Sequence, residues 1–109
     1  MSYTIGSQWP ADVVQAKGLD AIFLCQLPNY GISIEWQINE TPLRNYNSSA
    51  NDLIRREGRG NNTEALVIPA TPHLNESSVL CIMYIIGANQ TAEFIKSTPA
   101  TLVIQGCKV

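Results

Sequence analysis

The side chains that could do chemistry in this 109-residue chain are three cysteines, one histidine and nine carboxylates. Nucleophilic catalysis needs a nucleophile, a base and an orienting group within reach of one another. The one imidazole, His73, stands in a proline-flanked turn, and no G-x-S-x-G or comparable nucleophile motif occurs. We therefore expect His73 to be a surface turn residue, and we expect this domain to have no catalytic residue and not to be an enzyme.

The sequence supports a metal, cofactor or nucleic-acid site no better than it supports a catalytic site. The chain has no C-x-x-C, H-E-x-x-H, EF-hand spacing or glycine-rich phosphate loop, so neither a metal nor a cofactor is expected. A net charge of -2 creates no field that attracts a polyanion, which argues against nucleic acid. The basic group of Arg55, Arg56 and Arg59 encloses Glu57 and is expected to be a solvated hairpin. Function is therefore expected to lie in binding.

Five N-x-[ST] triplets, the acceptor motif for N-glycosylation, are present where chance would supply roughly one, given nine Asn and 15 Ser and Thr. They begin at Asn39, Asn47, Asn61, Asn75 and Asn89. Asn, Ser and Thr are also common turn residues, which explains part of the excess. The remainder favours exposure to the secretory pathway and predicts glycosylation at these asparagines.

Two of the three cysteines are expected to pair in an oxidising compartment, and counting alone does not say which two. Cys25 and Cys81 each lie in an apolar run, AIFLCQL and VLCIMYII, whereas Cys107 lies in the polar tail QGCKV. This context favours a Cys25–Cys81 disulfide, which would stabilise the fold by about 4 kcal/mol through loop closure. Cys107 is then a free or intermolecular thiol, or it pairs with a segment outside this sequence.

The stretch NESSVLCIMYIIGANQT holds eight consecutive apolar residues, Val79 to Ile86, between two of the N-x-[ST] triplets. A membrane-spanning helix needs about 20 apolar residues, so this run is too short to insert. The opening residues MSYTIGSQWP lack the basic and apolar regions of a secretory signal, so an extracellular protein would be an excised fragment or a mature form. Val79 to Ile86 is expected to be a β-strand.

Short strands must position these residues. Turn residues recur at short intervals, and the runs between them are rich in β-branched and aromatic residues. Period-two alternation is clear from Ala21 to Gln26 and from Ile32 to Ile38, whereas no helical periodicity persists. The sequence predicts a single all-β domain over residues 1–109, its core at about 10–105, with about seven to nine strands in a sandwich of two antiparallel sheets.

Several of these residues recur at a spacing typical of one β-sandwich family. Around the first cysteine they are Gly18, Phe23, Cys25 and Trp36. Up to the second cysteine they are Leu66, Ile68, Asn75, Ser77, Val79 and Cys81. From about residue 13 to 105 the chain resembles the intermediate or variable-like sets of the immunoglobulin superfamily. The resemblance implies an immunoglobulin-like β-sandwich in which Cys25 and Cys81 join the sheets and Trp36 packs on the disulfide in the core.

Two positions depart from the family's pattern. Val79 stands where the family has Tyr, so the tyrosine corner that locks the connection between strands E and F is expected to be absent. Asn75 replaces the usual Asp and removes the carboxylate that would pair with an arginine near strand D, although Arg55 and Arg56 are available there. Both departures argue against a strict variable domain.

The family's layout also implies a binding face, because strands C, F and G share a sheet and side chains alternate along each strand. With Cys81 pointing inward, four apolar side chains point outward: Leu80, Ile82, Tyr84 and Ile86. Such an apolar outer row is typical of an interface with a protein partner. The alternative is that neighbouring strands, a long loop or Lys and Arg stems cover the row, or that a bulge re-aims part of it.

The runs WQINETPL, LVIPATP and TPATLVIQG are similar to immunoglobulin modules in the ectodomains of invertebrate cell-surface receptors, some of which carry tyrosine kinases inside the cell. The resemblance implies an extracellular recognition or adhesion module of a single-pass membrane protein. Such a module would bind a protein homophilically or heterophilically, a dimer included. A secreted immune-recognition domain and an intracellular structural module are the alternatives.

Overall fold

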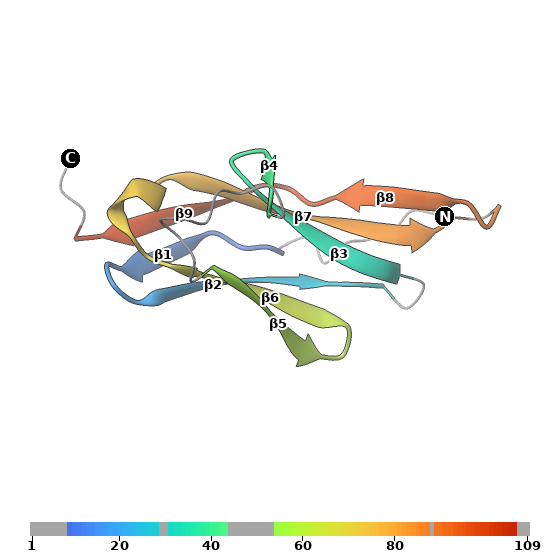
Figure 1. Ribbon diagram of the computed structural model, residues 1–109, viewed down its shortest axis with the longest axis horizontal. Coiled ribbons are helices and arrows are strands. Elements are labelled where there is room, and N and C mark those ends of the chain that lie inside the picture. The colour runs from blue at the N-terminus through green and yellow to red at the C-terminus, as the bar shows by residue number, and fades with distance from the viewer. Residues whose placement is uncertain (1–8, 29–30, 44–53, 88, 107–109) are drawn as a thin grey trace.

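The computed structural model describes residues 9–28, 31–43, 54–87 and 89–106, within which nine strands form two sheets (Figure 1). The larger sheet has the order β1 (Val13–Ala16), β9 (Ala100–Gln105), β7 (Ser77–Ile86), β3 (Gly31–Ile38), β4 (Thr41–Pro42), and β8 (Ala92–Lys96) also pairs with β7. The smaller sheet has the order β2 (Asp20–Gln26), β6 (Thr63–Pro69), β5 (Arg55–Gly60). A 3-10 turn, η2 (Pro72–Leu74), connects β6 to β7. Asn47 and Cys107 lie outside the described residues.

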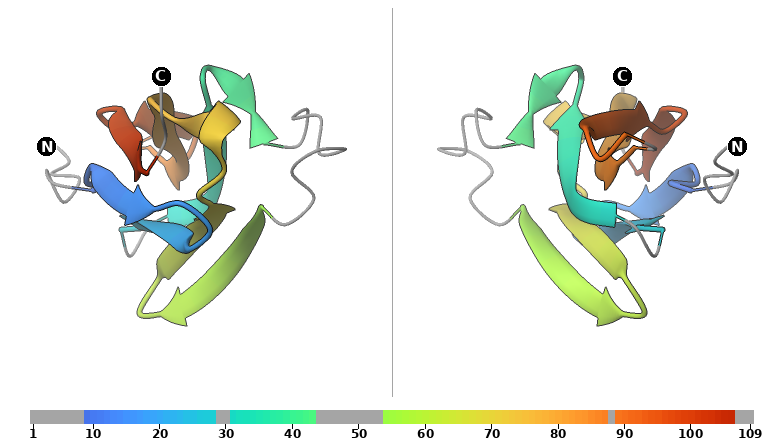
Figure 2. Two further views of the ribbon diagram at one scale, coloured as in Figure 1. Left: turned by 90° about the vertical axis from the view of Figure 1, so that its left-hand side faces the viewer. Right: turned by 90° about the vertical axis from the view of Figure 1, so that its right-hand side faces the viewer.

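The two sheets stack as the layers of a sandwich (Figure 2), which confirms the predicted all-β fold. Neighbouring strands pair antiparallel except at one edge, where β1 runs parallel to β9. The expectation of purely antiparallel sheets is wrong there, because β1 leads through a turn at Gly18, with φ of 91°, into the opposite sheet. It therefore forms no hairpin with β9.

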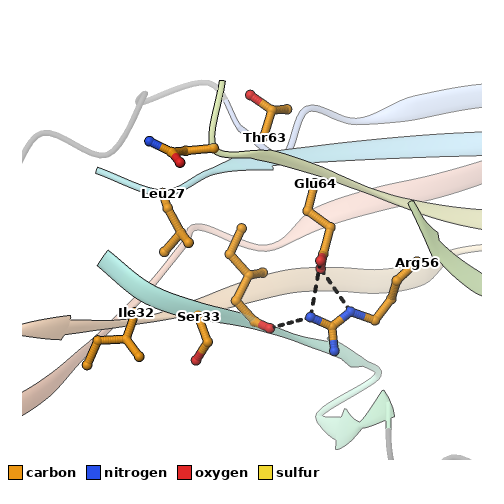
Figure 3. Close-up of a pocket in the computed structure, with 8 residues that line it drawn as sticks. Leu27, Ile32, Ser33, Arg56, Thr63 and Glu64 are labelled. Carbon is orange, nitrogen blue, oxygen red and sulfur yellow. Dashed lines mark hydrogen bonds and ion pairs between the residues drawn. The ribbon is translucent and has the colours of Figure 1, made fainter. Parts of the chain in front are cut away.

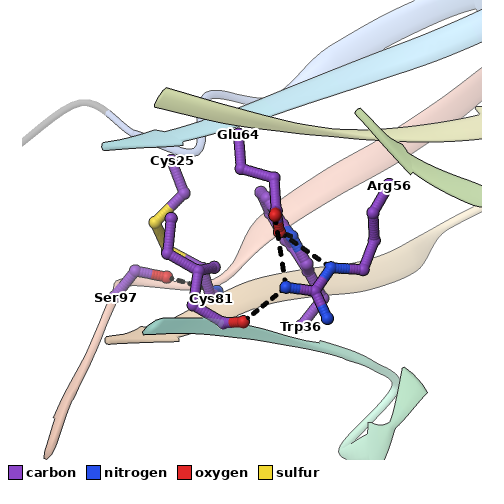
Figure 4. The surroundings of a disulfide bond; sticks show 7 residues. Cys25, Trp36, Arg56, Glu64, Cys81 and Ser97 are labelled. Carbon is purple, nitrogen blue, oxygen red and sulfur yellow. Dashed lines mark hydrogen bonds and ion pairs between the residues drawn. A yellow bond between two sulfur atoms is a disulfide. The ribbon is translucent and has the colours of Figure 1, made fainter. Parts of the chain in front are cut away.

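The core lies between the sheets and is built by the alternation read in the sequence. On β2 and β3 the buried residues are Ala21, Phe23, Cys25, Ile34, Trp36 and Ile38. Cys25 and Cys81 form the expected disulfide, which joins β2 to β7 with the two Cα atoms 6.5 Å apart (Figure 4). Trp36 is fully buried beside it. Val79, Met83 and Ile85 extend the buried row along β7.

Two hairpins turn through asparagine in the left-handed region of backbone space. The β3–β4 turn contains Asn39 and Glu40, with φ of 51° and 68°. The β5–β6 turn contains Asn61 and Asn62, with φ of 51° and 60°. Two-residue hairpin turns with positive φ at both positions match the twist of the flanking strands, and asparagine tolerates this conformation best after glycine.

The connection into β7 is held by backbone and amide contacts in place of a tyrosine corner. Val79 is fully buried. The side-chain oxygen of Asn75, at the end of η2, accepts a hydrogen bond of 2.8 Å from the Ile104 N–H. The Glu76 N–H donates to the Leu102 carbonyl at 2.7 Å. Asn75 thus ties η2 to β9.

Near its end the chain leaves the strand conformation between β8 and β9, and Ser97 is buried at this break. The Ser97 N–H donates to the Cys81 carbonyl at 2.9 Å, and the Ser97 hydroxyl accepts from the Cys81 N–H, also at 2.9 Å. The hydroxyl therefore satisfies a strand N–H at the point where the ladder is broken. This break lets β8 pair with one half of β7 while β9 pairs with the other.

Candidate functional site

The outer face of the larger sheet is organised by the pairing of β7 with β3 and β8. Directly paired residues in an antiparallel sheet point to the same side. Successive outward rows are therefore Gln37 with Leu80; Glu35, Ile82 and Lys96; Ser33, Tyr84 and Phe94; and Ile86 with Ala92. The apolar row of β7 thus has polar neighbours along β3, as expected, and an aromatic neighbour on β8.

Tyr84, Phe94 and Ile86 form the accessible apolar part of this face, which we call the aromatic patch. The rings of Tyr84 and Phe94 are 6.4 Å apart and tilted by 52°. Phe94 is 61% exposed and Ile86 is 43% exposed, whereas Tyr84 is half-buried. Aromatic rings at such a separation and tilt interact favourably, and exposed aromatic side chains are common anchors of protein interfaces. Phe94 was not singled out from the sequence, because only the strand register places it beside Tyr84.

The middle of the expected apolar row is covered. Ile82 is 6% exposed, and Leu80 is half-buried. The cross-strand neighbours of Ile82 are Glu35 and Lys96, whose aliphatic stems can lie over an apolar neighbour. The structure therefore differs from the expectation that all four apolar side chains are presented to a partner. The accessible apolar surface therefore lies at the end of β7 and on β8, whereas the expectation placed it along the centre of β7.

A polar bridge joins the two sheets beside the core tryptophan (Figures 3 and 4). The Glu64 carboxylate on β6 accepts a hydrogen bond from the Trp36 indole N–H at 2.8 Å and one from the Arg56 Nε at 2.9 Å. Arg56 Nη2 also donates to the Ile34 carbonyl on β3 at 2.7 Å. Arg56 therefore spans from β5 to the other sheet, while its side chain stays 46% exposed, in keeping with the expectation of a solvated hairpin.

Two shallow hollows flank Arg56 and have volumes of about 320 and 430 Å³. The first, drawn in Figure 3, is lined by Leu27, Ile32, Ser33, Ile34, Arg56, Asn62, Thr63 and Glu64. Its one carboxylate and one guanidinium bind each other, so neither is poised as a general acid or base.

The outer face of the smaller sheet carries an exposed ionic cluster. Arg55 bonds Glu57 at 2.8 Å and Asp20 at 3.3 Å, and Arg59 bonds Glu57 at 3.1 Å. The hydrogen bond from Arg55 lowers the pKa of Glu57 below its ordinary value, and the same bond raises the pKa of Arg55. Because these side chains are well exposed, their ion pairs contribute little to stability.

Four of the five predicted glycosylation sites fall within the described residues. Asn39, Asn61 and Asn89 are exposed, and Asn75 is half-buried. The Asn39 side chain donates a hydrogen bond to the Ser77 hydroxyl and accepts one from the Ser78 N–H, which places it near Asn75. Asn61 and Asn89 lie in the β5–β6 and β7–β8 turns, toward the opposite end of the sandwich from η2 (Figure 1).

Neither a metal centre nor a membrane-crossing helix is found in the part of the chain that the structure describes. Its His, Cys, Asp and Glu side chains form no cluster of three or more that could hold a metal ion. None of its helical segments has the length and apolar character needed to cross a bilayer.

Comparison with solved structures finds immunoglobulin domains at low sequence identity. Domain D1 of Duf (Kirre) is similar with a TM-score of 0.67 at 16% identity, over 88% of this chain and 91% of that chain. The D1–D2 structure of Rst gives 0.66 at 20% identity, over 88% of this chain and 46% of that one. The I9–I11 tandem of titin gives 0.58 at 16% identity, over 85% of this chain and 29% of that one. No protein-family model and no curated protein matches the chain.

The two stacked sheets, the disulfide between them and these similarities define the fold as an immunoglobulin-like β-sandwich. The chain is therefore an immunoglobulin-like domain. The structures to which it is similar are immunoglobulin-type domains and not enzymes, which agrees with the expectation that this domain is not an enzyme.

Proposed function

We propose that this domain is an extracellular recognition module that binds a protein partner through the aromatic patch on the outer face of its larger sheet. The observation that carries the proposal is the pair of Tyr84 with Phe94, which leaves Phe94 61% exposed beside Ile86 at 43%. Accessible aromatic side chains bordered by polar residues have the composition of an interface centre and its rim. The disulfide and the excess of N-x-[ST] triplets support an extracellular setting.

A second copy of this chain is the partner that the charges favour. Ile82 separates Glu35 on β3 from Lys96 on β8. Sheets that pack face to face keep their strands nearly aligned. A two-fold axis parallel to β7 then places Glu35 of each copy against Lys96 of the other, whereas an axis across the strands would oppose like charges. The face is therefore self-complementary in one arrangement.

Sedimentation equilibrium of the folded domain tests the patch. Phe94→Asp is expected to weaken self-association by about 30-fold, the effect of losing an interface anchor worth about 2 kcal/mol. Ile86→Asp should also weaken it. Ile22→Asp is a matched control, because Ile22 is 42% exposed but lies on β2 of the other sheet. Equal effects of Phe94→Asp and Ile22→Asp would rule out the patch.

A charge exchange tests the second copy as the partner. Lys96→Glu is expected to weaken association, and adding Glu35→Lys to the same chain should restore it, since both contacts are then reversed together. A wild-type domain that stays monomeric at high concentration would exclude the homophilic arrangement. The heterophilic alternative would then be tested by the same Phe94 and Ile22 variants against a partner.

We further propose that the module belongs to the cell-surface part of a single-pass membrane protein. A secreted recognition protein has the same kind of domain without a membrane-spanning segment elsewhere in the chain, so the full-length transcript distinguishes the two. An intracellular structural module would keep its cysteines reduced. Thiol labelling of the protein in its own cells checks this point, and reduced Cys25 and Cys81 would refute the extracellular setting.

A further inference from the structure

The predicted glycosylation sites differ in what their side chains do. A sugar is attached to the side-chain amide nitrogen of asparagine, so a glycosylated asparagine must direct that nitrogen to solvent. The four sites within the described residues all follow the N-x-[ST] pattern and are equivalent in the sequence. In the folded domain they divide into two pairs with different surroundings.

Both polar atoms of the Asn39 side chain are used inside the domain. Its oxygen accepts a hydrogen bond of 2.9 Å from the Ser78 N–H, and its nitrogen donates to the Ser77 hydroxyl at 3.3 Å. Ser77 is 3% exposed. The Asn39 backbone N–H also bonds the Ser78 carbonyl at 2.8 Å. The amide nitrogen therefore points toward a buried group on β7, and a sugar attached to it would displace this contact.

Asn75 is also committed to the fold. Its side-chain oxygen accepts from the Ile104 N–H at 2.8 Å in a half-buried position, and its backbone N–H donates to the Pro72 carbonyl at 3.1 Å. An amide orientation fixed on β9 restricts the directions open to a bulky substituent. A sugar replaces a hydrogen of the amide nitrogen and leaves the oxygen able to accept, so at Asn75 the half-buried position and the fixed amide orientation oppose the sugar. Attachment at Asn39 before folding would cost the nitrogen its bond to Ser77, so modified chains would fold less well and be depleted from secreted protein.

Asn61 and Asn89 have the opposite character. Both are exposed and lie in turns, and among the described residues neither side chain makes a hydrogen bond. Asn61 contributes its backbone carbonyl, which accepts from the Gln26 side chain at 3.0 Å. Its positive φ explains why asparagine suits the turn, and this backbone role leaves the amide group free.

We infer that N-glycosylation of the described sites is confined to Asn61 and Asn89, and that Asn39 and Asn75 serve the fold. This inference rests on the secretory exposure in the proposed function. It places the sugars at the end of the sandwich that holds the β5–β6 and β7–β8 turns, away from η2 (Figure 1). The Asn89 sugar then lies in the turn that directly follows Ile86, so it borders the aromatic patch on one side.

The test is glycopeptide mapping of the domain secreted from a eukaryotic cell, with enzymatic sugar removal in ¹⁸O water to mark each occupied asparagine. Thr63→Ala and Thr91→Ala destroy the Asn61 and Asn89 motifs without changing either asparagine, and each is expected to remove one glycan from the intact mass. Thr41→Ala does the same to the Asn39 motif and is expected to leave the mass unchanged apart from the substitution.

Sugar on Asn39 or Asn75 in the folded, secreted protein would overturn the inference, and so would an unmodified Asn61 or Asn89. Self-association of the enzymatically deglycosylated domain is measured separately with the Phe94→Asp variant. A failure of the aromatic patch as an interface is therefore distinguishable from a failure of the glycan assignment.

Discussion

Removing the Glu64 carboxylate should destabilise the domain through the core tryptophan. In Glu64→Ala the indole N–H of Trp36, a residue with 0% exposure, loses its acceptor at 2.8 Å. An unsatisfied buried donor costs about 1–3 kcal/mol. The ion pair with Arg56 adds at most about 0.5 kcal/mol, because the Arg56 side chain is 46% exposed and screened by water. We therefore expect a loss of about 2 kcal/mol in total.

Urea unfolding of the oxidised domain measures this loss, with Glu64→Gln as the matched control. Glutamine keeps an acceptor for the indole and removes only the charge, so its cost should stay under about 1 kcal/mol. In a thermal scan, the alanine variant should melt roughly 10 °C below the wild type. Equal losses in the two variants would refute the assignment to the indole bond. An alanine variant within about 0.5 kcal/mol of the wild type would refute the reasoning altogether.

Three further predictions concern contacts that the fold creates. Ser97→Ala leaves the Cys81 N–H without its acceptor and should lower the unfolding free energy by about 1–3 kcal/mol, and an unchanged urea midpoint would contradict this. Asn75→Ala should cost about 1 kcal/mol, whereas Asn75→Asp keeps the acceptor for β9 and should cost less, as compared by urea unfolding; equal costs would count against that bond. The pKa of Glu57 is lowered by Arg55, so its contribution is present above its ordinary pKa of 4.5 and is lost as the pH falls through the lowered value. Acid unfolding curves of wild type and Glu57→Gln should therefore converge at low pH, and parallel curves would argue against this contribution.

The strands and the disulfide could be predicted because their signals are local. Alternation from Ala21 to Gln26 and from Ile32 to Ile38 matches the buried faces of β2 and β3. Cys25 and Cys81 lie in apolar runs that become inward-facing strands, and they pair. A period of two needs only neighbouring residues to be read, so the sequence contains it in full.

The binding face could be predicted only in part. The outward direction of Ile82, Tyr84 and Ile86 follows from alternation relative to Cys81. Their exposure does not, because it depends on which strands lie on either side and on the register of the pairing. That register puts Glu35 and Lys96 beside Ile82, and it adds an aromatic side chain from β8 that the sequence did not mark as a candidate.

The asparagines of the N-x-[ST] motifs show most clearly which properties follow from the sequence and which follow from the tertiary structure. The N-x-[ST] pattern is a property of three consecutive residues, so the positions where a sugar transferase could act can be read directly from the chain. Whether each amide is free was decided by tertiary structure, because the partners of Asn39 and Asn75 are 39 and 29 residues away along the chain, in β7 and β9. The same holds for the Trp36 indole, whose acceptor on β6 is 28 residues distant. Periodicity and motif are local and can be read directly, whereas hydrogen bonds between strands exist only once the sheets have paired.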